Sequence, residues 1–106
     1  MAEKYARINI NDAVKAFREN ANSVLLDVRE VDEYAEKHIL GSVNVPLSTI
    51  EKVAEVIKDK HTLVYVHCRS GVRSIKASDA MIEMGYDNLI EAGGIIDFVG
   101  ETQSNK

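Results

Sequence analysis

The chain contains one cysteine, Cys68, which is followed by a short segment of anion-binding residue types. Arg69 and Arg73 lie within this segment, and Ser70 and Gly71 stand between them. A thiolate is a strong nucleophile, and a guanidinium group binds oxyanions through a planar fork of N–H donors. This combination suits nucleophilic attack on a small, negatively charged substrate.

The residues around Cys68 indicate the elements that position it. The apolar run 63–66 lacks polar alternation, which is typical of a buried strand in a parallel sheet. A helical pattern begins at about Arg73, so Cys68 is expected between the carboxyl end of a strand and a helix, where ligands bind in such sheets. Backbone N–H groups that curl into a helix form an anion site and favour the thiolate, and Gly71 permits a positive φ. An inert buried cysteine is the alternative, but it would leave the adjacent arginines unexplained.

The rest of the chain alternates predicted strands and helices. The helix that follows Thr49 is expected to turn Val53, Val56 and Ile57 inward. This alternation predicts an α/β fold. Further strands are expected at 5–10, 23–28, 43–45 and 88–92, and further helices after 12, across 30–37, from about 73 and at 95–98.

Composition limits the classes of function. With 106 residues, of which 45% are hydrophobic and 28% charged, the chain suits one globular domain. The formal net charge of −4 argues against nucleic acid as the main partner. A lone cysteine forms no internal disulfide, and no apolar stretch has the length of a membrane span or signal peptide, so a cytoplasmic protein without a membrane partner is expected. The histidines lack metal-ligand spacing, so neither a metal nor another cofactor is expected.

The spacing after Cys68 separates two families that place a cysteine loop between a strand and a helix. Phosphatase loops have five residues between the cysteine and the phosphate-binding arginine, whereas four separate Cys68 from Arg73. The shorter loop resembles that of rhodanese-type sulfurtransferases. The Asp-Val-Arg motif at 27–29, the His-Ile-Leu-Gly-Ser-Val-Asn-Val-Pro segment at 38–46 and the glycine pair at 93–94 resemble further features of that family.

The resemblance covers roughly residues 5–98 and implies a doubly wound α/β fold, with a central parallel β-sheet flanked by helices. We therefore expect a single rhodanese-like domain over residues 1–100 and a frayed polar tail at 101–106. Two positions depart from the family pattern. Lys37 stands where glycine is usual, and Phe98 stands where tryptophan is usual.

The resemblance also implies a thiosulfate sulfurtransferase that needs no cofactor. Cys68 would attack the outer sulfur of a small anionic donor such as thiosulfate and hold that sulfur as a persulfide. The acceptor would be cyanide or a thiol, including the thiol of a protein. The anion loop would comprise Arg69, Ser70, Gly71, Val72 and Arg73, with Asp27, Arg29 and Ser74 in supporting positions.

Structural roles are expected for the other charged residues. Asp27 and Arg29 are expected to hold loops together through partly buried hydrogen bonds, and His38 is expected to be a hydrogen-bonded turn residue. The solvated face of a short helix is expected to carry Glu30, Asp32, Glu33, Glu36 and Lys37.

Two other classes of function remain open. A phosphatase or an arsenate reductase would also use a nucleophilic cysteine in an anion-binding loop, although the loop length argues against both. A non-catalytic module would carry or sense persulfide for a partner, and an intact cysteine is compatible with that role.

Overall fold

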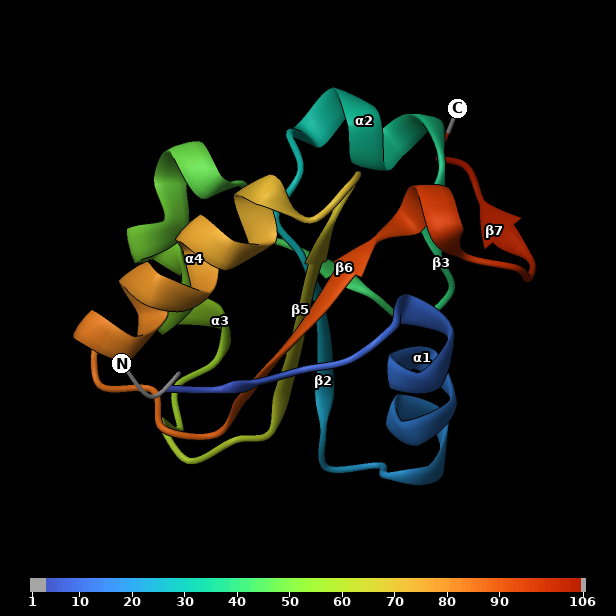
Figure 1. Cartoon of the computed structure of the whole chain (residues 1–106). Coiled ribbons are helices and arrows are strands. Elements are labelled where there is room, and N and C mark those ends of the chain that lie inside the picture. The colour runs from blue at the N-terminus through green and yellow to red at the C-terminus, as the bar shows by residue number, and fades with distance from the viewer. Residues whose placement is uncertain (1–3, 106) are drawn as a thin grey trace.

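A five-stranded sheet forms the centre of the molecule, and every pair of neighbouring strands in it is parallel. The computed structural model describes residues 4–105. Figure 1 shows the sheet between helices on either side, as expected for a doubly wound α/β domain. Across the sheet the strands are β1 (Ala6–Arg7), β6 (Leu89–Gly94), β5 (Val64–Cys68), β2 (Val24–Asp27) and β4 (Val43–Asn44).

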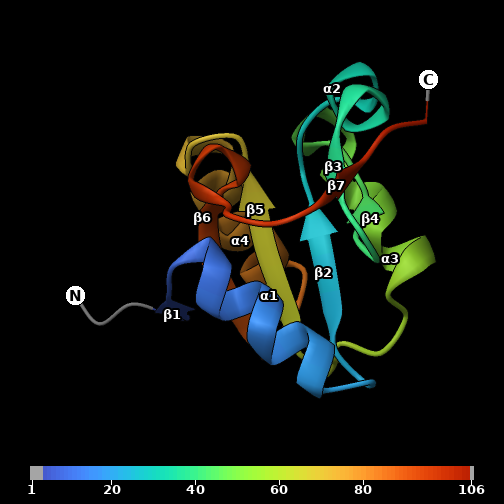
Figure 2. The ribbon, with the colours of Figure 1, turned by 90° about the vertical axis from the view of Figure 1, so that its right-hand side faces the viewer.

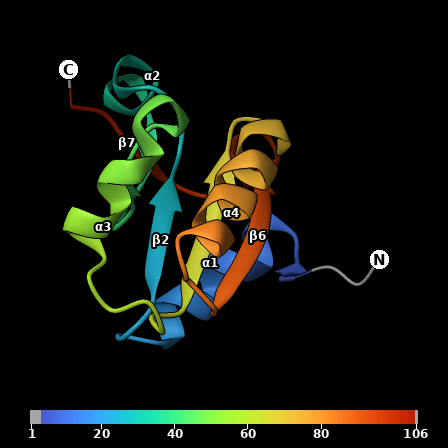
Figure 3. The ribbon, with the colours of Figure 1, turned by 90° about the vertical axis from the view of Figure 1, so that its left-hand side faces the viewer.

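Helices cover both faces of the sheet. Helix α1 (Ile10–Glu19) lies in front of the strands in Figure 2, whereas α3 (Val53–Val56) and α4 (Val72–Glu83) lie in front in the opposite view of Figure 3. Neighbouring residues of β2 serve opposite faces, because Leu25 packs in the α1 core and Leu26 packs in the core under α4. Burial on both faces explains why the central strands are continuous apolar runs.

The shorter elements differ in type from what the sequence predicts. The segment after Pro46 begins as the 3-10 helix η1 (Leu47–Lys52) before α3, and the expected final helix is the single 3-10 turn η2 (Ile95–Asp97). Val53 and Ile57 are buried as predicted, but the prediction for Val56 is wrong, since it is 51% exposed. Val53 and Ile57, four residues apart, face the core, whereas Val56 at the end of α3 faces solvent.

The expected frayed tail is the clearest correction to the fold. Strand β7 (Thr102–Gln103) pairs antiparallel with β3 (His38–Ile39), and the Asn105 N–H donates to the Ala35 carbonyl at 2.8 Å. Backbone hydrogen bonds hold this segment in place. Such bonds do not require apolar side chains, so the polar sequence of the segment did not indicate a strand. Residues 1–3 of the predicted domain and residue 106 of the predicted tail lie outside the described residues.

Three chain segments meet at the carboxyl ends of the central strands. They are the loop between β5 and α4, helix α2 (Val31–Glu36) and the β6–η2 junction, which lie together at the top of Figure 1. In parallel sheets this edge is where ligands bind. None of the helices formed by residues 4–105 has the length and apolar character of a membrane span.

Candidate active site

Cys68 is the last residue of β5, and its side chain lies beneath the loop that leads into α4. The residue is only 1% exposed. The Gly71 N–H donates to Cys68 Sγ at 3.0 Å, and Gly71 has the predicted positive φ, at +109°, immediately before the helix. A backbone donor and the amino end of a twelve-residue helix therefore face the sulfur and favour negative charge on it.

The loop packs directly on the backbone of β6. Cys68 is in register with Gly94, and a Cβ placed on Gly94 would lie 2.0 Å from the Arg69 carbonyl oxygen. The Ile96 N–H donates to that same oxygen at 3.1 Å. The sequence predicted that the strand ends at residue 92, but β6 continues through Gly94, whose missing side chain makes room for the cysteine loop.

Ser74 and Glu91 form a buried polar contact behind the sulfur. Ser74 Oγ lies 3.5 Å from Cys68 Sγ and 2.5 Å from Glu91 Oε2. Glu91 is 2% exposed and also accepts hydrogen bonds from the Gly93 N–H at 2.7 Å and from Arg7 Nε at 3.2 Å. Sequence reasoning placed Ser74 near the site but missed Glu91. The sequence feature that could have indicated Glu91 is that it is a carboxylate within an otherwise apolar strand.

The Arg73 guanidinium is engaged in an ion pair with Glu33. Its Nη1 and Nη2 donate to Glu33 Oε1 and Oε2 at 2.5 and 2.9 Å, linking α4 to α2. These hydrogen bonds lower the pKa of Glu33 to about 2 and raise the pKa of Arg73. The expectation that Glu33 belongs to a solvated helix face is therefore wrong, because α2 turns this carboxylate toward the loop.

We expect the ion pair to make stability depend on pH. The pKa of Glu33 is about 2 in the folded protein, below its ordinary value of 4.5, so the pair stabilises the fold fully above that ordinary value. Its contribution declines as the pH falls toward 2. Glu33→Gln should lower the free energy of unfolding by about 1 kcal/mol at neutral pH, as for a partly exposed pair. Denaturant titrations should show this difference shrinking between pH 5 and pH 2, whereas a constant difference would contradict the assignment.

Asp27 and Arg29 form a buried pair at the end of β2, as the sequence predicted. Arg29 Nη2 donates to Asp27 Oδ2 at 2.7 Å and to the Lys37 carbonyl at 2.6 Å, so the pair connects β2 to the end of α2. Lys37 has a φ of −164°, which is extended backbone open to any residue, so glycine is not required there.

His67 lies 3.9 Å from Asp27, too far for a hydrogen bond, and burial lowers its pKa and favours the neutral ring.

His38 has the structural role that the sequence predicted. Its ring stacks on Tyr34 with centroids 4.0 Å apart, and His38 Nδ1 lies 2.8 Å from the Tyr34 carbonyl oxygen. Phe98, which stands where the family usually has tryptophan, packs at the edge of the core beneath α1. In the described part of the chain, no cluster of histidine, cysteine and carboxylate side chains could hold a metal ion.

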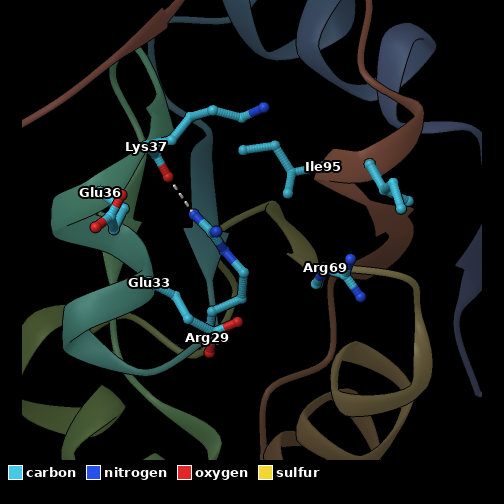
Figure 4. A pocket seen from close by; sticks show the side chains of 7 residues that line it. Arg29, Glu33, Glu36, Lys37, Arg69 and Ile95 are labelled. Carbon is cyan, nitrogen blue, oxygen red and sulfur yellow. Dashed lines mark hydrogen bonds between the residues drawn. The ribbon is translucent and has the colours of Figure 1, made fainter.

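A cavity of about 330 Å³ opens beside the loop. Figure 4 shows Glu33, Glu36 and Lys37 on one wall and Arg69 and Ile95 on the other, with the Arg29 side chain between them. The Arg69 side chain is exposed and makes no ion pair with any residue in 4–105. Neither Cys68 nor Arg73 lines the cavity. Of the two predicted binding arginines, the structure thus places Arg69 on the cavity wall and Arg73 against Glu33.

Known proteins are similar to this chain in sequence and fold. The family model described as "Rhodanese-like domain" matches residues 11–100. A relative named thiosulfate sulfurtransferase PspE, from Escherichia coli strain K12, is 37% identical over 68% of this chain and 70% of its own length. A relative from Bacillus subtilis strain 168, named putative sulfur carrier protein YrkF, is 34% identical over 86% of this chain, which spans only 51% of that protein.

A solved structure agrees with these sequence relationships. The structure described as rhodanese with anions from E. coli is 32% identical, superposes with a TM-score of 0.71, and is matched over 77% of this chain and 98% of its own. A TM-score of 0.71 shows that this chain and that structure share the fold, with a central parallel sheet and helices on both faces in this chain. By sequence and by fold, the chain belongs to the rhodanese-like domain family.

Proposed function

We propose that the protein is a sulfurtransferase that moves sulfane sulfur from thiosulfate to a thiol or cyanide through a persulfide on Cys68. The observation that carries this proposal is the contact between Cys68 Sγ and the Gly71 N–H at the start of α4. This contact supports a reactive sulfur in an anion-binding loop. The relative named thiosulfate sulfurtransferase adds support for the choice of donor.

The reaction has two balanced halves. The Cys68 thiolate attacks the outer sulfur of thiosulfate, a sulfur–sulfur bond forms on the enzyme, and the bond within thiosulfate breaks to release sulfite. Backbone N–H groups of residues 69–73 stabilise the anionic outer sulfur, as an oxyanion hole stabilises a negatively charged intermediate. Cyanide or a thiolate then attacks that outer sulfur and restores the Cys68 thiolate. The cavity beside Arg69 offers room for an organic thiol or for the cysteine of a partner protein.

Arg69 is the side chain best placed to attract the dianionic donor. Arg69→Ala should raise the KM for thiosulfate about five-fold, which corresponds to roughly 1 kcal/mol for a charge in contact with solvent. Steady-state thiocyanate formation measures this effect. Arg18→Ala is the matched control, because Arg18 is exposed in the last turn of α1 and its loss changes the net charge equally. Equal KM values in both variants would remove Arg69 from the donor site.

Arg73 supports the site in a different way in this proposal. Its charge still lies close enough to Cys68 for the two groups to interact electrostatically, while its guanidinium stays on Glu33. Arg73 therefore holds the loop against α2, and its positive charge attracts a negatively charged sulfur. A donor could bind the Arg73 guanidinium only if the ion pair between Arg73 and Glu33 were broken.

A persulfide carrier is the second candidate, and the relative named as a putative sulfur carrier protein favours it. A carrier would load sulfur once per Cys68 and release it only to its own partner protein. An enzyme would turn over repeatedly with thiosulfate and cyanide, with double-reciprocal plots that are parallel.

The short loop predicts negligible hydrolysis of an aryl phosphate by the same protein. Phosphate hydrolysis as fast as thiocyanate formation would favour the phosphatase alternative.

The proposed unit of function is the folded domain over residues 4–105, including the paired β7 segment. A free thiol as nucleophile suits a reducing compartment such as the cytoplasm. No nucleic acid and no membrane enter the proposed reaction.

A further inference from the structure

A buried row of three polar side chains connects Cys68 to a carboxylate that the proposed reaction has not used. The row runs from Cys68 Sγ to Ser74 Oγ, at 3.5 Å, and from there to Glu91 Oε2, at 2.5 Å. Cys68, Ser74 and Glu91 are 1%, 0% and 2% exposed. Buried polar atoms must satisfy one another, so the positions of the protons in this row are constrained.

The Ser74 hydroxyl has one proton to donate, and most of its neighbours are acceptors. Glu91 Oε2 lies at 2.5 Å, and the carbonyl oxygens of Gly71 and Gly93 lie at 3.0 and 3.3 Å. While Cys68 is a thiol, its S–H donates to Ser74 Oγ, and Ser74 donates to the ionised Glu91. Every proton in the row then has an acceptor.

Loss of the thiol proton disrupts this pattern. A thiolate or a persulfide leaves Cys68 Sγ without a proton, so Sγ becomes one more acceptor around the single Ser74 proton. The sulfur still accepts from the Gly71 N–H, but it also receives a hydrogen bond from Ser74 if Glu91 carries a proton and donates it to Ser74 Oγ, which frees the hydroxyl proton for the sulfur. An ionised Glu91 beside a thiolate would instead place two negative charges in one buried site.

We propose that Glu91 receives the proton of Cys68 through Ser74 and holds it for as long as Cys68 is a thiolate or carries sulfur. The proton leaves Sγ for Oγ while the hydroxyl proton leaves Oγ for Oε2. The net charge of the row is unchanged, no electrons are transferred and no co-reactant is needed. The proton returns along the same path when the cycle ends. The place of this step in a catalytic cycle rests on the proposed function, and Glu91 is a positioning residue because it acts through Ser74.

Charged groups lie at both ends of the row. Those at one end stabilise negative charge on Glu91, and those at the other end stabilise negative charge on Cys68. At the Glu91 end, Arg7 on β1 and the Gly93 N–H bind the carboxylate at 3.2 and 2.7 Å. At the sulfur end, Arg73 on α4 interacts with Cys68 and is itself paired with Glu33 on α2. Further titratable neighbours lie on β5 and β2: His67, whose pKa is lowered by burial, which favours the neutral ring, and the ion-paired Asp27 and Arg29.

The pH dependence of Cys68 alkylation by iodoacetamide tests this proposal. The alkylation rate follows the thiolate fraction and requires no sulfur transfer. Two groups that share a proton titrate in two steps, so the wild-type rate should reach an intermediate plateau and rise again at higher pH. Glu91→Gln should remove the plateau and give one step. Ser74→Ala should do the same, which keeps the proposal testable if Glu91→Gln does not fold.

Glu83→Gln is the matched control, since it removes the same charge from an exposed site at the far end of α4 and should keep both steps. A single step in the wild type, or two steps that persist in both Glu91→Gln and Ser74→Ala, would overturn the proposal. Intact mass after thiosulfate separates this result from the proposed function. If two steps are present and Glu91-dependent while no sulfur is taken up, the proton transfer stands and the sulfurtransferase proposal fails.

Discussion

Cys68→Ser is expected to abolish sulfur transfer, lowering thiocyanate formation from thiosulfate and cyanide by a factor of about 1,000 or more. A serine hydroxyl at this position is not ionised at neutral pH, and oxygen does not hold sulfane sulfur as a persulfide does. The substitution changes one buried atom, which keeps the Gly71 N–H and Ser74 Oγ within hydrogen-bonding reach. Thiocyanate measured by its iron complex gives the rate.

The control for this variant is its stability, because Cys68 is buried in the core beneath α4. A thermal midpoint within a few degrees of wild type, together with lost turnover, assigns the loss to the sulfur atom. Ser70→Ala provides a second comparison, since Ser70 is exposed in the same loop and its hydroxyl has no role as nucleophile. Normal turnover by Cys68→Ser would show that Cys68 is not the nucleophile.

Gly94→Ala is expected to cost about 100-fold in the rate of sulfur transfer, because the new methyl group must displace the cysteine loop. Its Cβ would lie 2.0 Å from the Arg69 carbonyl oxygen and 2.5 Å from Ser70 Cα, and both neighbours are backbone atoms that cannot rotate away. Moving the loop would also disrupt the contact between the Gly71 N–H and Cys68 Sγ. The folded protein should lose about 1 to 3 kcal/mol from overpacking.

Gly85→Ala separates loop displacement from a general loss of stability. Gly85 follows the C-cap of α4 and has a φ of +100°, so alanine is strained there, but no atom lies within 4 Å of the new Cβ. We expect Gly85→Ala to lower stability by about 1 kcal/mol and to leave the turnover of the folded protein unchanged. If Gly94→Ala kept wild-type turnover, the loop would not depend on close packing against β6.

Elements that depend on neighbouring residues were predictable from the sequence. The apolar run before Cys68 indicated β5, the glycine at position 71 indicated a positive φ, and both predictions agree with the structure. The Asp27–Arg29 pair was also predictable, because two residues of opposite charge at the end of a buried strand can satisfy each other locally.

Contacts between distant segments could not be read from local patterns. The pair between Glu33 and Arg73 depends on which side of the short α2 faces the loop, and the β2–α2 connection sets that orientation. Glu91 shares the α4 face of β6 with Leu89 through strand alternation, but its partner Ser74 is on another element. The pairing of β7 likewise depends on a free edge at β3, since polar residues 102–103 carry no strand pattern.

The most direct test of the account is the intact mass of the wild-type protein after thiosulfate, and again after cyanide. The protein should gain the mass of one sulfur atom, located at Cys68 by peptide mapping, and should lose it completely as thiocyanate when cyanide is added. The Cys68→Ser variant should keep its original mass throughout. A wild-type protein whose mass does not change with thiosulfate, or whose added sulfur maps elsewhere and stays after cyanide, would contradict the persulfide on which the proposed function depends.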